Sequence, residues 1–391
     1  MKSLSQSPLD PAFVQDPYPF YETARSHGPF FHWADYDAIA TPNAAACAAI
    51  FRDRRFGREA PAERAPKIPP HLAPFYAVEA HSMLELEPPR HTRLRGLVLR
   101  AFTSRRIQAL APEIAALSHQ LIDAFPQGEF DLLQHFAQKL PVIIIARLLG
   151  VPETMSDDLL RWSNAMVGMY MAGRDRARED RAVTATEAFV AFMRSYIEAR
   201  RAEPRDDLIT ALIAAEETGE KLSTDELITT CILLLNAGHE ATVHTIGNGV
   251  KTLLETGNTI TPETAEACSE EILRFDPALH IFTRWAYEDV EVMGHRFARG
   301  DQVSLLLAAA NRDPGVWEDP ASFHPSRSAK AHVSFGGGLH FCVGAPLARL
   351  ELQIALPILF QRLPKLRLTT KPRYADVYHF HGLKTLMLRA D

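Results

Sequence analysis

The feature that most constrains this fold is a long stretch without proline that begins at Ser223 and runs to Gly257. Ser223 and Glu226 have the spacing of a capping box, in which two side chains bond backbone N–H groups at the start of a helix. Glycine is a common residue just past the end of a helix. The stretch therefore predicts a single helix of about 34 residues, roughly 50 Å long.

The middle of this stretch, CILLLNAGHEATVHTIGNGV, is apolar on nearly every side, so the helix should cross the core of the protein. Four polar residues lie within seven positions of it: Asn236, His239, Glu240 and Thr242. A single buried polar group is usually a satisfied packing residue. Four of them beside Gly238, which weakens a helix, are too many for that reading alone and indicate that something binds there.

The rest of the chain predicts a mainly α protein with small β-sheets, in the α+β class. Of its 391 residues, 47% are hydrophobic and 23% are charged, which allows a large core and excludes disorder, collagen and coiled coil. Phe30 to Thr41 alternates as one or two strands would, and the proline-rich segment from Pro61 to Pro89 cannot hold a long helix. Amphipathic helices follow from Pro89 to about Arg201. No repeat or linker divides the chain, so we expect one domain, residues 1–391.

The charge and the termini exclude several classes of protein. A net charge of -6 argues against nucleic-acid binding, because no global positive field is present. The N-terminus has no apolar signal region, and no run of about 18 apolar residues occurs. We therefore expect a cytoplasmic protein without a membrane span. We also expect it to be a monomer. The four cysteines form no CxxC pair, which suits neither a disulfide scaffold nor a structural zinc site: Cys47, Cys231, Cys268 and Cys342.

One cysteine follows a glycine-rich segment, FGGGLHFCVG (Phe335 to Gly344), directly before a predicted helix. Glycines allow close backbone approach, and the helix N-terminus offers N–H groups that stabilise a thiolate. Cys342 is therefore a candidate nucleophile or metal ligand with a lowered pKa. Three alternatives remain: a buried thiol that only packs, a phosphate loop that lacks the usual glycine motifs, and a zinc site shared with His340. Pro357 should kink or end the helix that follows.

The segment matches every fixed position of FGxGxHxCxG and so resembles the haem-thiolate signature of the cytochrome P450 mono-oxygenases. The resemblance implies the P450 fold, with the long core helix lying over haem b. It also implies that Cys342 is the axial ligand of the haem iron, that Phe335 packs near its sulfur and that His340 meets a haem propionate. Gly344 completes the cofactor-binding signature. Thiolate ligation pushes electron density toward the iron and favours O–O cleavage.

A second motif, EILR, places Glu271 and Arg274 three residues apart on one face of a helix that should start at Thr261-Pro262. Alone, such a pair is usually a solvated salt bridge. The resemblance joins it to Arg327, in FHPSR, as a buried triad. We expect these three residues to be structural, because a buried ion network fixes geometry.

A third motif lies in LELEPPRHTRLRGLVLRAFT, where His91 and Arg95 share one helix face. The two carboxylates of haem need cationic donors, and arginine suits them geometrically. The resemblance assigns His91 and Arg95 to the propionates, together with Arg284 in HIFTRWA. A solvated basic helix face is the alternative for any one of these residues alone.

The core helix carries AGHEAT, similar to the family's AGxET or AGxDT. The resemblance implies that Ala237 and Gly238 make room for O2 and that Glu240 is the acid that helps deliver protons. The usual threonine, whose hydroxyl orients water and donates a hydrogen bond during O–O cleavage, is Ala241 here. Thr242 comes one residue later, about 100° round the helix, and does not simply replace it.

Three outcomes of this departure are open. Ordered water or a substrate hydroxyl can supply the missing donor, Thr242 or His239 can substitute through local helix distortion, or the protein can prefer peroxide to O2. We favour the first.

The expected activity is mono-oxygenation of a hydrophobic organic substrate with O2, and the alternatives are a peroxide-driven peroxygenase and a haem-thiolate ligand sensor without turnover. Glu240 and the small Ala237-Gly238 pair favour an enzyme.

The family pattern also implies where substrate and electron donors bind. The walls of a mostly apolar chamber would include the proline-rich loop and these side chains: Asn236, Ala241, Ile281, Phe282 and Phe380. His280 or His381 could add one polar contact, although a structural role suits either better.

The stretch after Cys342 is too short for a flavin or nicotinamide domain, so a ferredoxin and a ferredoxin reductase should supply electrons. Candidate docking residues are Arg105, Arg106 and Arg349.

Overall fold

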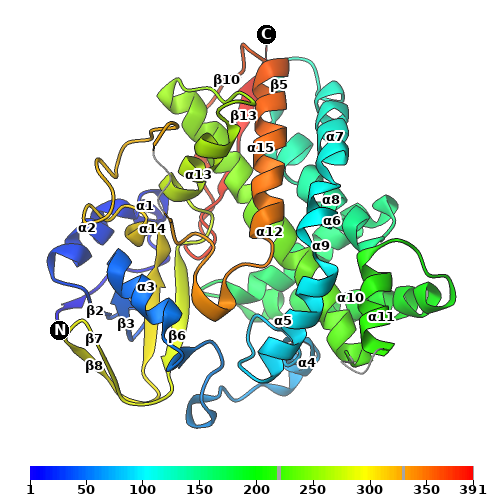
Figure 1. Cartoon of the computed structure of the whole chain (residues 1–391). Coiled ribbons are helices and arrows are strands. Elements are labelled where there is room, and N and C mark those ends of the chain that lie inside the picture. The colour runs from blue at the N-terminus through cyan, green and yellow to red at the C-terminus, as the bar shows by residue number, and fades with distance from the viewer. Residues whose placement is uncertain (218–221, 328–330, 391) are drawn as a thin grey trace.

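The computed structural model describes residues 1–217, 222–327 and 331–390 (Figure 1). A sheet-rich region holds the N-terminal strands together with β6 and β9, and a larger helical region holds the elements from α4 to α11. The long helix α12 passes through the middle of the molecule and contacts helices on several sides, including α8, α10 and α15. The predicted class, mainly helical with small sheets, is confirmed.

The longer α-helices are α2 (Tyr18–Ser26), α3 (Ala44–Arg52), α5 (Arg90–Ala101), α7 (Ala111–Asp123), α8 (Lys139–Leu149), α9 (Ser156–Val167), α10 (Arg176–Ala202), α11 (Leu208–Glu217), α12 (Thr224–Thr256), α13 (Ala265–Phe275) and α15 (Ala345–Arg362). The shorter helices are α1 (Pro11–Gln15), α4 (Ala73–Glu79), α6 (Ser104–Gln108), α14 (Leu307–Ala310) and the turns η1 (Ala62–Arg64), η2 (Pro70–Leu72), η3 (Leu133–Ala137), η4 (Glu153–Met155), η5 (Gly168–Tyr170) and η6 (Gly338–His340).

The main sheet has the order β1-β2-β3-β9-β6-β4, and smaller sheets pair β10-β13-β5, β11-β12 and β7-β8. Most neighbours are antiparallel, but β1 runs parallel to β2, and β3 runs parallel to β9 with Ile39 opposite Val303. The strands are β1 (Ser3–Leu4), β2 (Phe31–Trp33), β3 (Ala38–Thr41), β4 (Phe56–Gly57), β5 (Glu129–Asp131), β6 (Ile281–Ala286), β7 (Val290–Val292), β8 (His295–Phe297), β9 (Gln302–Leu306), β10 (Arg367–Leu368), β11 (Arg373–Tyr374), β12 (Leu383–Thr385) and β13 (Met387–Arg389).

The long helix follows its sequence signals closely. Ser223 and Glu226 form the predicted capping box at the start of α12, and Gly257 ends it in the left-handed conformation at φ 68°. Most of its side chains are buried, in a hydrophobic core that continues through α7 to α11 and α15. A separate core cluster around Trp33 lies beneath the main sheet. No helix of the described ranges is both long and apolar enough to cross a membrane.

Two helix boundaries differ from the expectation. Helix α13 starts at Ala265 and not at Thr261-Pro262, because Thr261 and Thr264 form a hydrogen-bonded turn in front of it. Helix α15 runs past Pro357 to Arg362, so the prediction that it could end at the proline is wrong. Leu356 and Leu359 are fully buried on either side of Pro357, and their burial offsets the lost backbone hydrogen bond.

Candidate functional site

The loop before α15 depends on its glycines. Gly336 and Gly338 adopt positive φ values of 67° and 66°, which side chains disfavour. A Cβ on Gly338 would lie 1.8 Å from the carbonyl oxygen of Phe51, so only glycine fits there. The backbone N–H of Cys342 donates to the carbonyl of Phe335 at 3.1 Å and closes the loop. The loop therefore holds Cys342 at a set position in front of α15.

The thiol of Cys342 differs from the other three. Cys47, Cys231 and Cys268 are buried, and burial raises the pKa of each thiol to about 12. Cys342 is accessible, yet enough protein surrounds it for burial to raise its pKa as well. The N–H groups of Gly344 and Ala345 and nearby arginines oppose this rise. The predicted lowering of the thiol pKa is therefore wrong for the protein alone, because desolvation outweighs the helix N-terminus.

Two histidines predicted from separate motifs meet beside this loop. The rings of His91 and His340 lie 4.3 Å apart. His91 is buried, its Nδ1 has no hydrogen-bond partner within the described ranges, and burial lowers its pKa to about 4. His340 donates from Nε2 to Glu87 at 2.8 Å. Burial raises the pKa of the Glu87 carboxyl, but hydrogen bonds from His340 and the Arg58 backbone outweigh it and lower the pKa overall.

Two arginines lie beside this pair of histidines. Arg95 donates to the carbonyl of Phe341, the residue before Cys342, at 2.6 Å. Arg284 is buried above the ring of Phe51, and burial lowers its pKa to about 10. Its only hydrogen bond within the described part of the chain goes to the carbonyl of Thr283, so most of its N–H donors are available for an anion.

The middle of α12 is accessible along one side and buried on the others. Ala237 is exposed and Ala241, one turn later, is half-buried, while His239, Thr242 and Val243 are buried. Small side chains therefore border an open space within an otherwise enclosed helix. The hydroxyl of Thr242 donates to the carbonyl of Gly238 at 3.3 Å, along its own helix. That hydroxyl is thus already engaged.

The predicted substrate contacts do not all lie on one surface. Asn236 donates from Nδ2 to the sulfur of Met166 at 3.6 Å, and its buried Oδ1 lacks a partner among the described residues. Phe282 lies against Gly336 of the cysteine loop, while its neighbour Ile281 is buried in the core cluster around Trp33. Neighbouring residues of a strand point to opposite faces, so Phe282 is the accessible one of the pair. Phe380 is half-buried, close to His244 of α12.

The structure brings together the three residues expected to be structural. Arg274 donates to both carboxylate oxygens of Glu271 at 2.7 Å, and Arg327 donates to Oε1 at 3.3 Å. Arg274 also donates to three backbone carbonyls, those of Asn311, Pro320 and Ser322. Every strong donor and acceptor in this network is therefore used.

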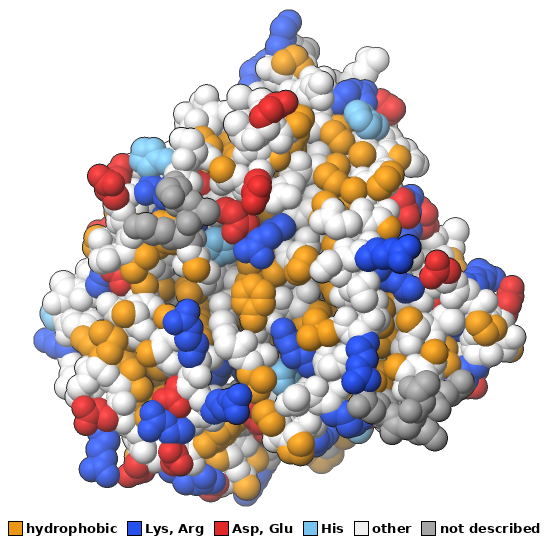
Figure 2. All heavy atoms as spheres, in the orientation of Figure 1, with side chains coloured by type: hydrophobic (Ala, Val, Ile, Leu, Met, Phe, Trp, Pro, Cys, Tyr) orange, Lys and Arg blue, Asp and Glu red, His pale blue; other side chains and the backbone are white. Residues whose placement is uncertain are grey.

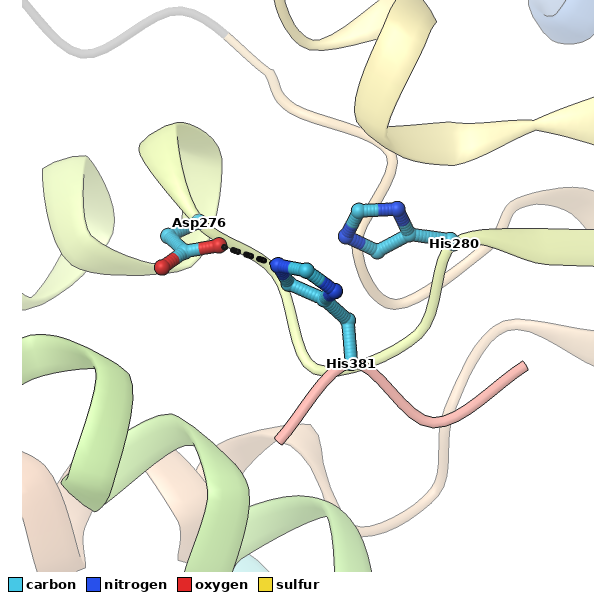
Figure 3. A group of neighbouring side chains, drawn as sticks. All are labelled: Asp276, His280 and His381. Atoms are coloured by element: carbon cyan, nitrogen blue, oxygen red, sulfur yellow. Dashed lines mark ion pairs between the residues drawn. The ribbon is translucent and has the colours of Figure 1, made fainter. Parts of the chain in front are cut away.

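A second buried group, which the sequence did not predict as a unit, joins Asp276, His280 and His381 (Figure 3). Their possible metal-ligand atoms all lie within 4.8 Å of one another, and His280 points toward the pair formed by His381 Nε2 and Asp276 Oδ1, 3.5 Å apart. The Lys251 ammonium, 3.2 Å from Asp276 Oδ2, already neutralises the carboxylate. A metal ion would have to compete with that ammonium in a buried site. The geometry therefore favours a structural polar network, in agreement with the reading of His280 and His381 as structural residues.

The donors around Cys342 fit an iron porphyrin. A reachable sulfur can hold the iron, and the unpartnered His91 Nδ1 and the spare donors of Arg284 match two carboxylate groups. This donor set, in a mainly helical fold with one long core helix, defines the class of haem-thiolate proteins.

Comparison with known proteins gives the family. The family model of cytochrome P450 matches residues 57–259 and 263–373. Cytochrome P450 107B1 of Saccharopolyspora erythraea is 40% identical over 85% of this chain and 81% of its own length, and 6-deoxyerythronolide B hydroxylase of the same organism is 38% identical over 74% and 72%. A solved structure of P450BioI in complex with an acyl carrier protein carrying hexadec-9Z-enoic acid superposes with a TM-score of 0.91 at 33% identity, covering 97% of this chain and all of that one. The chain belongs to the cytochrome P450 family.

The activity follows from this membership. Cytochromes P450 bind haem b, and this chain is a haem-thiolate mono-oxygenase, an oxidoreductase that oxidises hydrophobic substrates with electrons from redox partners.

Two residues of the site were missed from the sequence. Glu87 lies three residues before Arg90, the first residue of the helix that carries His91, but its contact with His340 spans 253 positions and has no local signal. His244 donates to Glu240 at 3.1 Å, and the spacing of four residues on one helix could have indicated this pair.

Proposed function

We propose that residues 1–391 act as one domain in which Cys342 holds the haem iron and the hydrogen-bond donors beside it hold the propionates: His91, Arg95, Arg284 and His340. Cys342 is the observation that carries the proposal, since it is the one accessible cysteine of the four and lies at the N-terminus of α15. Phe335 and Gly344 keep the sulfur in place, because Phe335 closes the loop and the backbone N–H of Gly344 bonds the sulfur.

The proposed reaction is the O2-dependent hydroxylation, or a related oxidation, of a hydrophobic organic molecule. Bound haem supplies the electron transfer and the O–O cleavage that no side chain can perform. Ala237, Gly238 and Ala241 leave the space beside α12 open, and Asn236 can orient a polar group of the substrate through its unpartnered Oδ1. Glu240, ionised at rest, accepts protons and passes them on to the reaction. The Thr242 hydroxyl is engaged with Gly238, so the missing donor at Ala241 is supplied by water or by the substrate.

We further propose that electrons come from a ferredoxin and its reductase in the cytoplasm, where four free cysteines stay reduced. Figure 2 shows Lys and Arg side chains spread around apolar groups on the face where α15 begins. Arg105 is exposed and pairs with no acid in the described ranges, which leaves it free for an acidic partner. Arg106 and Arg349 are already paired, with Asp206 and Glu270. The variant Arg105→Glu should therefore raise the KM for an acidic ferredoxin, most strongly at low salt.

The absorption spectrum of the reduced, CO-bound protein tests the assignment of Cys342. The wild-type protein should show the long-wavelength Soret band of a thiolate-ligated haem, and Cys342→Ser should lose it. Cys268→Ser, which alters a buried thiol elsewhere, is the matched control and should keep the band. Survival of the band in Cys342→Ser would overturn the assignment.

Product analysis tests the use of O2. With a ferredoxin, its reductase and 18O2, the hydroxylated product should carry the label. Label-free product formed only with added hydrogen peroxide would instead support the peroxygenase reading that the alanine at position 241 allows.

A further inference from the structure

The acid of the core helix has an imidazole partner one turn away. His244 Nε2 lies 3.1 Å from Glu240 Oε1, and both side chains are largely buried. Residues four apart share one helix face, so α12 itself holds this pair in register.

His244 is also the partner that sets the charge of Glu240. Burial raises the pKa of the Glu240 carboxyl, but the hydrogen bond and charge of His244, with a smaller contribution from His239, outweigh it, and the pKa is lowered overall. His239 lies close as well, with Nδ1 3.6 Å from Glu240 Oε2, but burial lowers its pKa to about 4 and keeps it neutral near pH 7. His244 therefore makes the largest contribution to keeping Glu240 ionised.

The other ring nitrogen of His244 faces the C-terminal segment. His244 Nδ1 is buried and has no hydrogen-bond partner among the described residues. A Cβ on Gly382 would lie 1.8 Å from this atom, so the imidazole can occupy its position only because residue 382 is glycine. His381, next in the chain to Gly382, also has a buried Nδ1 without a partner in the described ranges.

A line of ionisable groups continues from there toward the surface. His381 Nε2 is 3.5 Å from Asp276 Oδ1 (Figure 3), and Lys251 Nζ is 3.2 Å from Asp276 Oδ2. Lys251 lies 3.8 Å from Glu255, whose side chain is 44% exposed. The charges that act on His381 are those of Asp276, Lys251, His244 and Arg312. Titratable and charged side chains therefore lie between the His244 ring and the partly exposed Glu255, on the side of the C-terminal loop.

We propose that His244 is the proton-transfer partner of Glu240, which it fixes in place and supplies with protons that enter past Gly382. In each transfer the Nε2–H bond of the imidazolium breaks and an O–H bond forms on Glu240. The neutral ring then regains a proton that originates from bulk water. This inference rests on the proposed role of Glu240 in oxygen activation.

The test uses His244→Asn, which keeps a polar side chain but cannot ionise, with Glu240→Gln to assign signals. Infrared difference spectra of the haem-bound protein report the protonated carboxyl of Glu240 as a band that Glu240→Gln lacks. In His244→Asn this band should appear at higher pH than in the wild type, because burial remains and the imidazole is gone. His71→Asn, which removes the imidazole of another His–carboxylate pair, at 2.7 Å from Glu179, is the matched control and should leave the band unchanged.

Turnover gives the second measurement. His244→Asn should lower kcat about tenfold or more, with little change in substrate KM, and should raise the solvent isotope effect on kcat. Gly382→Ala displaces the His244 ring and should shift both measurements in the same direction. An unshifted Glu240 band together with wild-type kcat in His244→Asn would overturn the proposal. Full turnover in Glu240→Gln with a shifted band in His244→Asn would instead overturn the role of Glu240 and leave the coupling of the pair established.

Discussion

Two buried carboxylates on neighbouring helices of this protein have opposite surroundings. Glu271 on α13 accepts hydrogen bonds from two arginines and from the backbone N–H of His324. Glu240 on α12 has a hydrogen bond from His244 only, and the nearby ring nitrogens of His239 have no partner within the described chain. A fully satisfied ionic network holds a structure in one arrangement, whereas a partly satisfied titratable group is available for chemistry. The difference separates a structural acid from a proton-carrying acid within one fold.

The largest effect should come from the satisfied network. Glu271→Gln leaves Arg274 as a buried charge without its counter-ion and should lower the free energy of unfolding by about 3–5 kcal/mol. Urea unfolding followed by circular dichroism measures this loss. The exposed pair Arg161–Asp158 is the matched control, and Asp158→Asn should cost less than about 1 kcal/mol. Equal losses in the two variants would contradict the comparison.

The acid of the core helix should show the reverse behaviour. Glu240→Gln should reduce turnover by about 10²-fold, because a positioned group that accepts protons and passes them on is lost. Its free energy of unfolding should change by less than about 1 kcal/mol, since only one hydrogen bond depends on the carboxylate. Steady-state kinetics and urea unfolding of the same preparation measure both quantities. A destabilisation as large as that of Glu271→Gln would show that Glu240 is structural.

The pH dependence of stability tests the protonation state of His239. Burial lowers the folded-state pKa of His239 to about 4, below the usual 6.5, so the unfolded chain binds the extra proton between these values. His239 therefore lowers stability as the pH falls from about 6.5 to 4, by up to about 1.4 kcal/mol per pH unit. In His239→Leu, the free energy of unfolding, measured from unfolding curves at several pH values, should fall less steeply as the pH is lowered. The difference in slope should correspond to at most one proton fewer taken up on unfolding. An unchanged slope would mean that His239 is already protonated in the folded protein.

The smallest effect is expected at Ala241. Ala241→Thr adds one hydroxyl beside the open side of α12 and should shift the partition between product and peroxide leakage by about 1 kcal/mol, or about fivefold. The measurement is the ratio of product formed to electrons consumed. If hydroxylation and leakage stay as they are in the wild type, position 241 has no role in oxygen activation.

Local patterns predicted the elements that depend on neighbouring residues. The capping box and Gly257 gave both ends of α12 correctly, because caps are contacts within one turn. Two helix boundaries were harder to predict. The start of α13 depends on a turn that the Thr264 side chain closes, and the continuation of α15 past Pro357 depends on the burial of its flanking leucines. The pKa of Cys342 was predicted with the wrong sign, because a helix N-terminus is visible in a sequence but desolvation is not.

By itself, the sequence determined the mainly helical class, the core helix and the cysteine loop, since each is written in residues a few positions apart. It also contained the family motifs through which the haem site and the mono-oxygenase activity were expected. Only the tertiary structure decided which buried polar groups are satisfied. The pairing of His340 with Glu87 and the position of Gly382 against His244 join segments more than a hundred residues apart. Such contacts arise from how the elements pack, and packing brings together groups that no local spacing connects.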